Sequence, residues 1–332
     1  MILFFTTDIE NEADLAPEIM EWKTVSKHGE DYLQDLLLIG LRNICGKEVV
    51  DFPKKEVMYN TCEIPDEELY GRGFTVWKKL EDIEVDRTRI WERLDQGEFE
   101  LVIFSSVWRQ QNFLQKFQRE GLWRKSKLVF IDGEDAGVQE KMSNEGLAIF
   151  GEYYKRESIR DDVLPISFSI PEKNIIEPRP KEKLFAKHVQ CPAAYQLIEV
   201  RDDCVMDYAF DNEQDYYDDI AVSKYAITMK KAGWDCLRHY EIAANGTIPC
   251  FWNLSEKPKG SGPHGLRDME NVIAFKDAQE LADKVKFIAS NDLYPAIQAN
   301  VLNWIRQNTC EEQARRLLSV QRDYWLTLGL WH

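Results

Sequence analysis

The chain has 332 residues and a formal net charge of −16, from 42 Lys and Arg against 58 Asp and Glu. At roughly 150 residues per domain this length predicts two domains. A hydrophobic content of 44% with 10 Trp speaks against a disordered chain. The acidity argues against a protein that coats nucleic-acid phosphates, because such binding depends on Lys and Arg. A local basic groove stays compatible with this charge.

The hydrophobic pattern of the sequence predicts neither a membrane span nor a signal peptide. No apolar run approaches the roughly 18 residues that indicate a membrane span. The first residues, MILFFTTD, lack a basic start and their apolar run ends at Asp8, so they predict a buried strand rather than a signal peptide. The 7 Cys are scattered without a CxxC pair, and the 5 His do not cluster. This pattern predicts reduced thiols in a cytoplasmic protein without a metal site.

The first third of the chain alternates short apolar runs with amphipathic stretches. The apolar runs predict strands at residues 2–6, 49–52, 101–105, 128–131 and 148–150. Helices are expected at residues 31–43 and 108–121, and residues 53–80 are less regular. This alternation predicts right-handed βαβ units and therefore a doubly wound parallel sheet.

Residues 152–182 differ in character from the sequence before them. A charged stretch is followed by four prolines within a short span: Pro165, Pro171, Pro178 and Pro180. Such proline density is typical of a linker, with room for a crossing strand at residues 166–170. The predicted domains are residues 1–160 and residues 161–332.

The second half repeats the alternation. Strands are expected at residues 184–187, 205–208, 225–229, 248–252 and 272–275. Helices are expected at residues 215–224, 236–245, 278–290, 293–309 and 310–328. The predicted fold class is therefore α/β, with two Rossmann-like doubly wound lobes and helices at the C-terminus.

Residues 226–252 combine the parts of a phosphate site. A strand leads into a basic turn that contains Lys230, and Asp235 is placed to cap the helix that follows. Arg238 and Glu241 lie three residues apart and so share one helical face, and Gly246 suits a left-handed position after the helix. A helix N-terminus behind a strand attracts anions, and a carboxylate one turn further suits a diol such as ribose. These parts predict a site for a nucleoside diphosphate.

The same segment resembles the nucleotide-sugar half of GT-B glycosyltransferases, especially the exostosin-like and spore-maturation-like groups. The pattern is met at Lys230, Gly233, Trp234, Asp235, Arg238, Tyr240, Glu241, Gly246 and Pro249. Two positions depart from it. Gly233 stands where many retaining enzymes carry a second Glu, and Lys230 stands where exostosin-like relatives usually carry Arg, which loses the bidentate fork. The departures leave retention or inversion at the sugar open.

The resemblance implies a donor site in the second lobe. In it Glu241 would bind the ribose hydroxyls, Lys230 and Arg238 would hold the diphosphate, and Gly246 would let the helix pack closely on the strand. His264, in the glycine-rich loop 261–271, could touch the donor phosphate or sugar, although a plain surface loop is the simpler interpretation.

Inverting transfer also needs a general base for the acceptor hydroxyl. The candidates follow strands of the first lobe: Asp132, Glu134, Asp135 and Asp8. A purely structural role is the alternative for each. Arg72, between two glycines, is a weak candidate for a phosphate or acceptor contact. The acidic run 202–219 is predicted to be a solvated face, because it lacks the context of a DxD metal site.

The sequence therefore predicts a glycosyltransferase that uses a nucleotide-sugar donor with no metal and no further cofactor. The first lobe would provide the acceptor surface. Glycan, protein, small molecule and modified nucleic-acid base all stay open as acceptors, and so do the sugar and the oligomeric state. A non-catalytic nucleotide-sugar sensor and a structural protein with a degenerate donor site are the alternatives.

Overall fold

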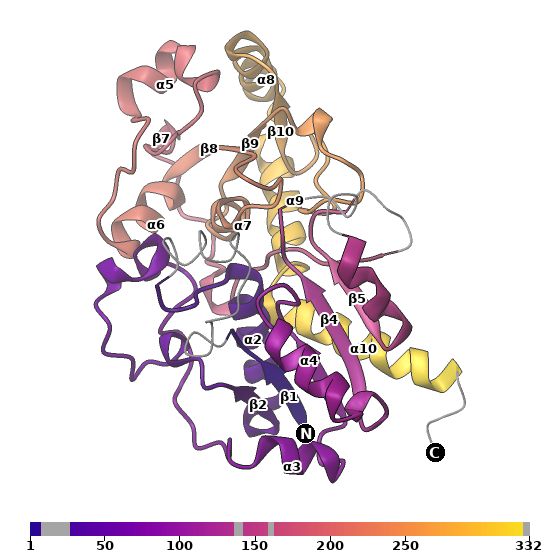
Figure 1. Cartoon of the computed structure of the whole chain (residues 1–332). Coiled ribbons are helices and arrows are strands. Elements are labelled where there is room, and N and C mark those ends of the chain that lie inside the picture. Colours follow the sequence, from indigo (N-terminus) through magenta and orange to yellow (C-terminus); the bar gives the residue numbers. More distant parts are fainter. Residues whose placement is uncertain (8–26, 136–141, 159–162, 328–332) are drawn as a thin grey trace. The chain divides into compact units, whose positions relative to one another are not determined.

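The computed structural model describes residues 1–7, 27–135, 142–158 and 163–327. The chain divides into two compact units. Unit 1 comprises Met1–Ile166 together with Cys310–His332, and unit 2 comprises Ser167–Thr309. Each unit contains one parallel sheet with helices (Figure 1). The two predicted α/β lobes are therefore present.

Unit 1 is built on a six-stranded parallel sheet in the order β2-β1-β3-β4-β5-β6. The strands are β1 (Ile2–Phe5), β2 (Val49–Phe52), β3 (Leu101–Phe104), β4 (Lys127–Asp132), β5 (Glu152–Lys155) and β6 (Leu164–Pro165). The strand order reverses between β1 and β3, which defines a doubly wound sheet. All four residues of β3 are buried, as expected for a central strand covered on both faces.

The helices of unit 1 are α2 (Tyr32–Cys45), α3 (Ile90–Asp95), α4 (Gln111–Arg119) and α10 (Cys310–Thr327). Helix α2 begins at Asp31, whose side chain accepts hydrogen bonds from Leu33 N at 3.1 Å and Gln34 N at 3.2 Å. Two donors of the first turn are thereby satisfied. Between β2 and α3 the chain forms short 3₁₀ turns and an isolated bridge between Tyr59 and Leu80, which agrees with the irregular sequence of residues 53–80.

Helix α10 lies in unit 1, whereas the sequence assigned residues 310–328 to the second lobe. The reason is a close approach to α2 at Gly40. A Cβ atom built on Gly40 would overlap the carbonyl oxygen of Cys310 and lie 3.1 Å from the Cβ of Ala314. The Asn43 amide also donates to Glu311 Oε1 at 2.6 Å. Sequence periodicity indicates that this helix has an apolar face but not which surface covers it.

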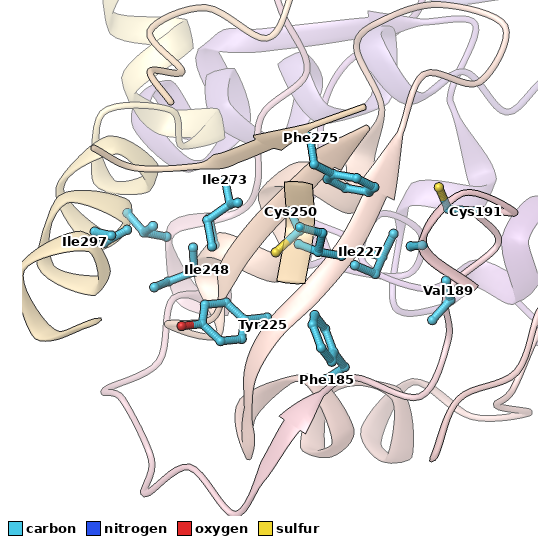
Figure 2. Packing of buried hydrophobic residues seen from close by; sticks show 14 of the residues in the cluster. Phe185, Val189, Cys191, Tyr225, Ile227, Ile248, Cys250, Ile273, Phe275 and Ile297 are labelled. Carbon is cyan, nitrogen blue, oxygen red and sulfur yellow. The ribbon is translucent and has the colours of Figure 1, made fainter. Parts of the chain in front are cut away.

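Unit 2 has a four-stranded parallel sheet in the order β10-β9-β8-β7. Its strands are β7 (Lys183–Phe185), β8 (Ser223–Met229), β9 (Ile248–Trp252) and β10 (Ile273–Phe275). Its helices are α5 (Ile198–Asp203), α6 (Glu213–Ala221), α7 (Leu237–Ala244), α8 (Ala278–Ser290) and α9 (Tyr294–Arg306). Figure 2 shows part of this core, in which Ile248 and Ile273 of the strands lie on the side of Ile297 of α9.

Three expected strands differ from the structure. Residues 148 and 149 belong to a 3₁₀ turn (Met142–Ile149), and the strand lies further on, at β5. Residues 166–170 form no strand, and residues 205–208 contribute only a bridge between Val205 and His188. The predicted linker consequently begins too early, since residues 152–155 form a buried strand and the division between the units falls at Ile166.

The physical reason for the early linker is that β5 and the residues after it bury charge. Lys155 is 1% exposed and pairs with Asp132 at 2.8 Å. Arg156 and Glu157, each 3% exposed, pair at 3.2 Å. A charged stretch is usually solvated. The burial of Lys155 depends on Asp132, which lies 23 residues away and is not indicated by the local sequence. Within the described part of the chain, no helix is both long and apolar enough to cross a membrane.

Candidate functional site

The basic turn after β8 lies at the carboxyl end of that strand, where ligands of open α/β sheets bind. Lys230 and Lys231 are exposed. The Nζ atom of Lys230 lies 5.3 Å from the ring centroid of Trp234. Lys231 donates from Nζ to Gln190 Oε1 at 2.6 Å, which joins this turn to the residues that follow β7. Two cations thus stand at the edge of the unit 2 sheet.

Arg238, in the first turn of α7, is held by three hydrogen bonds. Its Nε donates to the carbonyl oxygen of Ile227 at 3.1 Å, and Nη1 donates to the Tyr216 hydroxyl at 3.0 Å. Its Nη2 donates to the carbonyl oxygen of His188. The guanidinium is therefore fixed at the carboxyl ends of β7 and β8. An arginine carries five N–H donors in all, so these bonds leave it able to bind an anion as well.

Tyr216, on α6, connects the two functional candidates of α7. Its hydroxyl accepts from Arg238 and donates to Glu241 Oε2 at 2.7 Å. Glu241 is only 6% exposed and Tyr216 is 8% exposed. Burial raises the pKa of Tyr216 well above its usual range, so the phenol stays protonated and keeps its donor role. Arg238, Tyr216 and Glu241 form one hydrogen-bonded triad.

Asp235 does not cap α7 as the sequence predicted. The helix begins after Cys236, which makes no side-chain capping bond. Asp235 is buried, and its carboxylate accepts from Phe168 N at 2.5 Å and from the Tyr240 hydroxyl at 2.8 Å. A Cβ atom on Gly262 would lie 2.8 Å from Asp235 Cγ. The aspartate therefore ties the loop before α7 to two other segments of unit 2.

The two glycines of the predicted pattern shape the ends of α7. Gly246 follows the helix with a φ of 60°, the left-handed conformation that the sequence predicted. A Cβ atom there would lie 3.3 Å from Pro178 Cγ. Gly233 is buried in the turn before the helix, and its carbonyl oxygen accepts from Lys231 N at 3.0 Å.

His264 is half-buried in its loop, and its carbonyl oxygen accepts from Trp304 Nε1 at 2.7 Å. The same loop lies close to Asp235 at Gly262. His239, which the sequence left aside, is fully buried between Thr228 Oγ1 at 2.8 Å and the carbonyl oxygen of Trp234 at 2.9 Å. It is a core histidine.

Sequence reasoning missed Tyr216, because it stands inside the acidic run that was predicted to be a solvated face. The run is only partly solvated. Tyr216 and Ile220, four residues apart, form a buried face of α6, and the side chain of Asp219 is 8% exposed and pairs with Lys183. That i, i+4 apolar pair was the available signal for a buried face.

In unit 1, the candidate bases occupy different environments. Asp132 is 5% exposed, and both of its carboxylate oxygens accept hydrogen bonds, Oδ1 from Lys155 Nζ at 2.8 Å and Oδ2 from the Tyr153 hydroxyl at 2.7 Å. Asp135 is exposed and pairs with Arg156. Glu134 is 3.8 Å from Arg109. Asp8 lies outside the described residues.

The carboxyl ends of β1 and β3 meet at the point where the strand order reverses. Polar side chains that the sequence analysis did not select are buried there. Gln110 Nε2 donates to the carbonyl oxygen of Phe5 at 2.7 Å and to Ser105 Oγ at 3.0 Å, and Ser105 Oγ donates to Gln34 Oε1 at 2.8 Å. In doubly wound sheets this reversal marks the ligand crevice. Among the described residues, no cluster of three or more His, Cys, Asp or Glu could hold a metal ion.

Comparison with known proteins agrees with this fold. No family model matches the sequence, and no curated protein matches it. Similar solved structures include HepE of Anabaena in complex with UDP, with a TM-score of 0.50 and 10% identity over 97% of this chain and 99% of that one. Sucrose-phosphate synthase of Thermosynechococcus elongatus gives a TM-score of 0.50 and 11% identity over 98% and 99%. At such identities the likeness shows the fold, which is of the two-lobed GT-B type.

Proposed function

We propose that this protein is a glycosyltransferase that moves a sugar from a nucleoside-diphosphate sugar to an acceptor. The observation that carries the proposal is the Arg238–Tyr216–Glu241 triad, which lies beside the basic turn at the carboxyl end of β8. The proposal gains support from the GT-B fold and from HepE, a protein of this fold whose structure contains UDP. Membership of the exostosin-like group is part of the proposal.

The donor would bind to unit 2 through its charged groups. Lys230 and Arg238 would hold the diphosphate, and Glu241 would meet the ribose hydroxyls. Negative charge develops on the diphosphate as the bond to the anomeric carbon breaks. Fixed cations stabilise that charge without reorganising, and the three hydrogen bonds of Arg238 hold its guanidinium in place beforehand. These side chains supply the positive charge that a metal ion would otherwise provide.

The acceptor would bind to unit 1, where a base must remove the proton of its hydroxyl. Asp135 is the best of the four candidates that we predicted, of which Asp8 lies outside the described residues. Asp135 is exposed, whereas both oxygens of the buried Asp132 already accept hydrogen bonds. A base needs an accessible lone pair within reach of the proton. Asp135→Asn should therefore reduce turnover without loss of donor affinity.

The first experiment measures donor binding by thermal shift and calorimetry with UDP, ADP, GDP and UDP-glucose. A ligand at 100 times its dissociation constant should raise the free energy of unfolding by about 2.7 kcal/mol. Lys230→Ala should weaken binding of the active nucleotide. Lys224→Ala is the matched control, because Lys224 is also exposed and also lies near an aromatic ring, 5.9 Å from that of Tyr294, but at the amino end of β8.

Turnover separates the enzyme from the alternatives. Release of the nucleoside diphosphate in the presence of an acceptor supports transfer. Binding without release from any donor and acceptor pair would favour a nucleotide-sugar sensor. No stabilisation by any nucleotide, together with unchanged behaviour of Glu241→Ala, would point to a structural protein and remove the proposal.

A further inference from the structure

The segment that precedes α6 is attached to the carboxyl end of β7. Val205 forms a parallel bridge with His188. Its N–H donates to the carbonyl oxygen of Lys187 at 2.8 Å, and its own carbonyl oxygen accepts from Val189 N at 3.0 Å. The Cys204 thiol also donates to the carbonyl oxygen of Ala186 at 3.4 Å. The backbone up to Val205 is therefore fixed against the residues that follow β7.

The imidazole of His188 is held in place beside this segment and is uncharged. The residue is 5% exposed, and its Nδ1 donates to the carbonyl oxygen of Asp207 at 2.8 Å. Burial lowers the pKa of His188 to about 4, with a further contribution from the charge of Arg238. The ring is uncharged at neutral pH, because that pKa lies far below 7.

Tyr208 lies flat on this imidazole. The two ring centroids are 5.2 Å apart and the ring planes differ by 26°. Tyr208 is nevertheless 81% exposed. One face of the Tyr208 ring contacts His188, and most of the side chain is open to solvent. Such a ring offers a flat surface on which another planar ring can stack. Its support is formed beforehand, which lowers the entropy lost when a ligand binds.

The location of this surface gives it a function. The carbonyl oxygen of His188 accepts from Arg238, the residue proposed to hold the diphosphate. Two residues after His188, Gln190 accepts from Lys231 of the basic turn. The Tyr208 ring, which is planar and neutral, therefore rests on a residue whose backbone bonds Arg238 and which lies two positions before the partner of Lys231. A nucleoside diphosphate is complementary to this arrangement, because it has an uncharged planar base and a negatively charged phosphate end.

We propose that Tyr208, supported by His188, is the surface on which the nucleobase of the donor stacks. This inference rests on the proposed function and goes further, because it locates the binding position of the base at the 204–208 segment and names Tyr208 as the residue that binds it. Every base has a π-face, so stacking tolerates uracil, guanine or adenine alike. The stack would contribute affinity for a nucleotide over free phosphate, and other contacts would select the base.

Calorimetry with two probes tests the inference, namely the nucleoside diphosphate that binds wild type best and inorganic pyrophosphate. Loss of one base–aromatic stack costs about 1–3 kcal/mol, so Tyr208→Ala should lower the affinity for the nucleotide by about 5- to 150-fold. The affinity of this variant for pyrophosphate should equal that of wild type. Tyr208→Phe should bind like wild type, because the aromatic face remains. Phe287→Ala is the control, since Phe287 is an aromatic residue of α8 with 53% exposure.

The outcomes separate this inference from the proposed function. If Tyr208→Ala binds the nucleotide as tightly as wild type, the stacking role is overturned, but the proposed donor site is not. Equal weakening of nucleotide and pyrophosphate would overturn it too, since the tyrosine would then support the phosphate side. Wild-type protein that binds no nucleotide would overturn both. Upfield shifts of the Tyr208 ring protons on nucleotide addition would support the stack directly.

Discussion

Tyr216 donates its phenolic proton to the Glu241 carboxylate at 2.7 Å while its oxygen accepts from Arg238 at 3.0 Å. The tyrosine belongs to α6, and the other two residues belong to α7. A side chain from a different helix thus fixes the spacing between Glu241, the residue proposed to bind the ribose, and Arg238, the residue proposed to bind the diphosphate. Arg238 and Glu241 already share a helical face because they are three residues apart, and Tyr216 joins them through two hydrogen bonds.

Tyr216→Phe should disturb both stability and donor binding. The change removes a buried hydrogen bond to a charged group, which typically contributes about 1.5–3 kcal/mol, so the midpoint of urea unfolding should fall accordingly. Nucleotide affinity, measured by calorimetry, should fall as well because Arg238 loses one of its supports. The neighbouring Tyr217→Phe is the control. A Tyr216→Phe protein with wild-type nucleotide affinity would show that the triad serves the fold alone.

Gly40→Ala should destabilise unit 1, although the same change in an exposed helix interior stabilises by about 1 kcal/mol. The new methyl group would overlap the carbonyl oxygen of Cys310, and overpacking of this kind costs about 1–3 kcal/mol. Thermal unfolding should show the loss. Gly146→Ala is the control, because a Cβ atom there has no neighbour within 4 Å. An unchanged melting temperature for Gly40→Ala would contradict the packing of α10 on α2.

Stability should fall in mild acid because of two buried histidines. Burial lowers the pKa of His188 and of His239 to about 4, from an unperturbed 6.5. Between these values the unfolded chain binds the proton and the folded chain does not. The stabilisation is therefore complete above pH 6.5 and is lost as the pH falls toward 4, on the order of 3 kcal/mol for each histidine.

His239→Gln tests this pH dependence. The quantity compared is the slope of the free energy of unfolding against pH, not the stability at one pH. The free energy of urea unfolding should decrease less steeply in the variant than in wild type between pH 6.5 and 4. His264→Gln is the matched control, since it replaces a half-buried histidine of the same unit. Equal slopes for His239→Gln and wild type would contradict the burial of a neutral imidazole at residue 239.

Lys155→Met should be strongly destabilising because it leaves the charge of Asp132 buried. Removal of one partner from a buried ion pair typically costs about 3–5 kcal/mol, and both residues are almost fully buried. Lys125→Met is the control. Its pair with Asp95 is exposed, so its loss should cost less than about 1 kcal/mol. Similar losses for both variants would show that Asp132 is better solvated than the structure indicates, and would restore it as a candidate base.

Much of the fold was predictable from hydrophobic pattern. The apolar runs LVIF and LVFI correspond to β3 and to the middle of β4, and the helix expected at residues 31–43 is α2. These elements bury their own side chains, so a short window of sequence contains the signal. Strand β5, with the sequence EYYK, was missed because the charge of its Lys155 is neutralised by Asp132, which lies 23 residues away in the chain.

Local sequence patterns were enough to predict the alternation of strands and helices, the glycine that follows α7, and the spacing that puts Arg238 and Glu241 on one face. These are consequences of local geometry and of side-chain order. Three other features became clear from the folded chain: Asp235 is an anchor rather than a cap, α10 packs on α2, and Tyr216 joins the two residues of α7. Each of those depends on a contact between residues distant in sequence, and burial gives such contacts their strength.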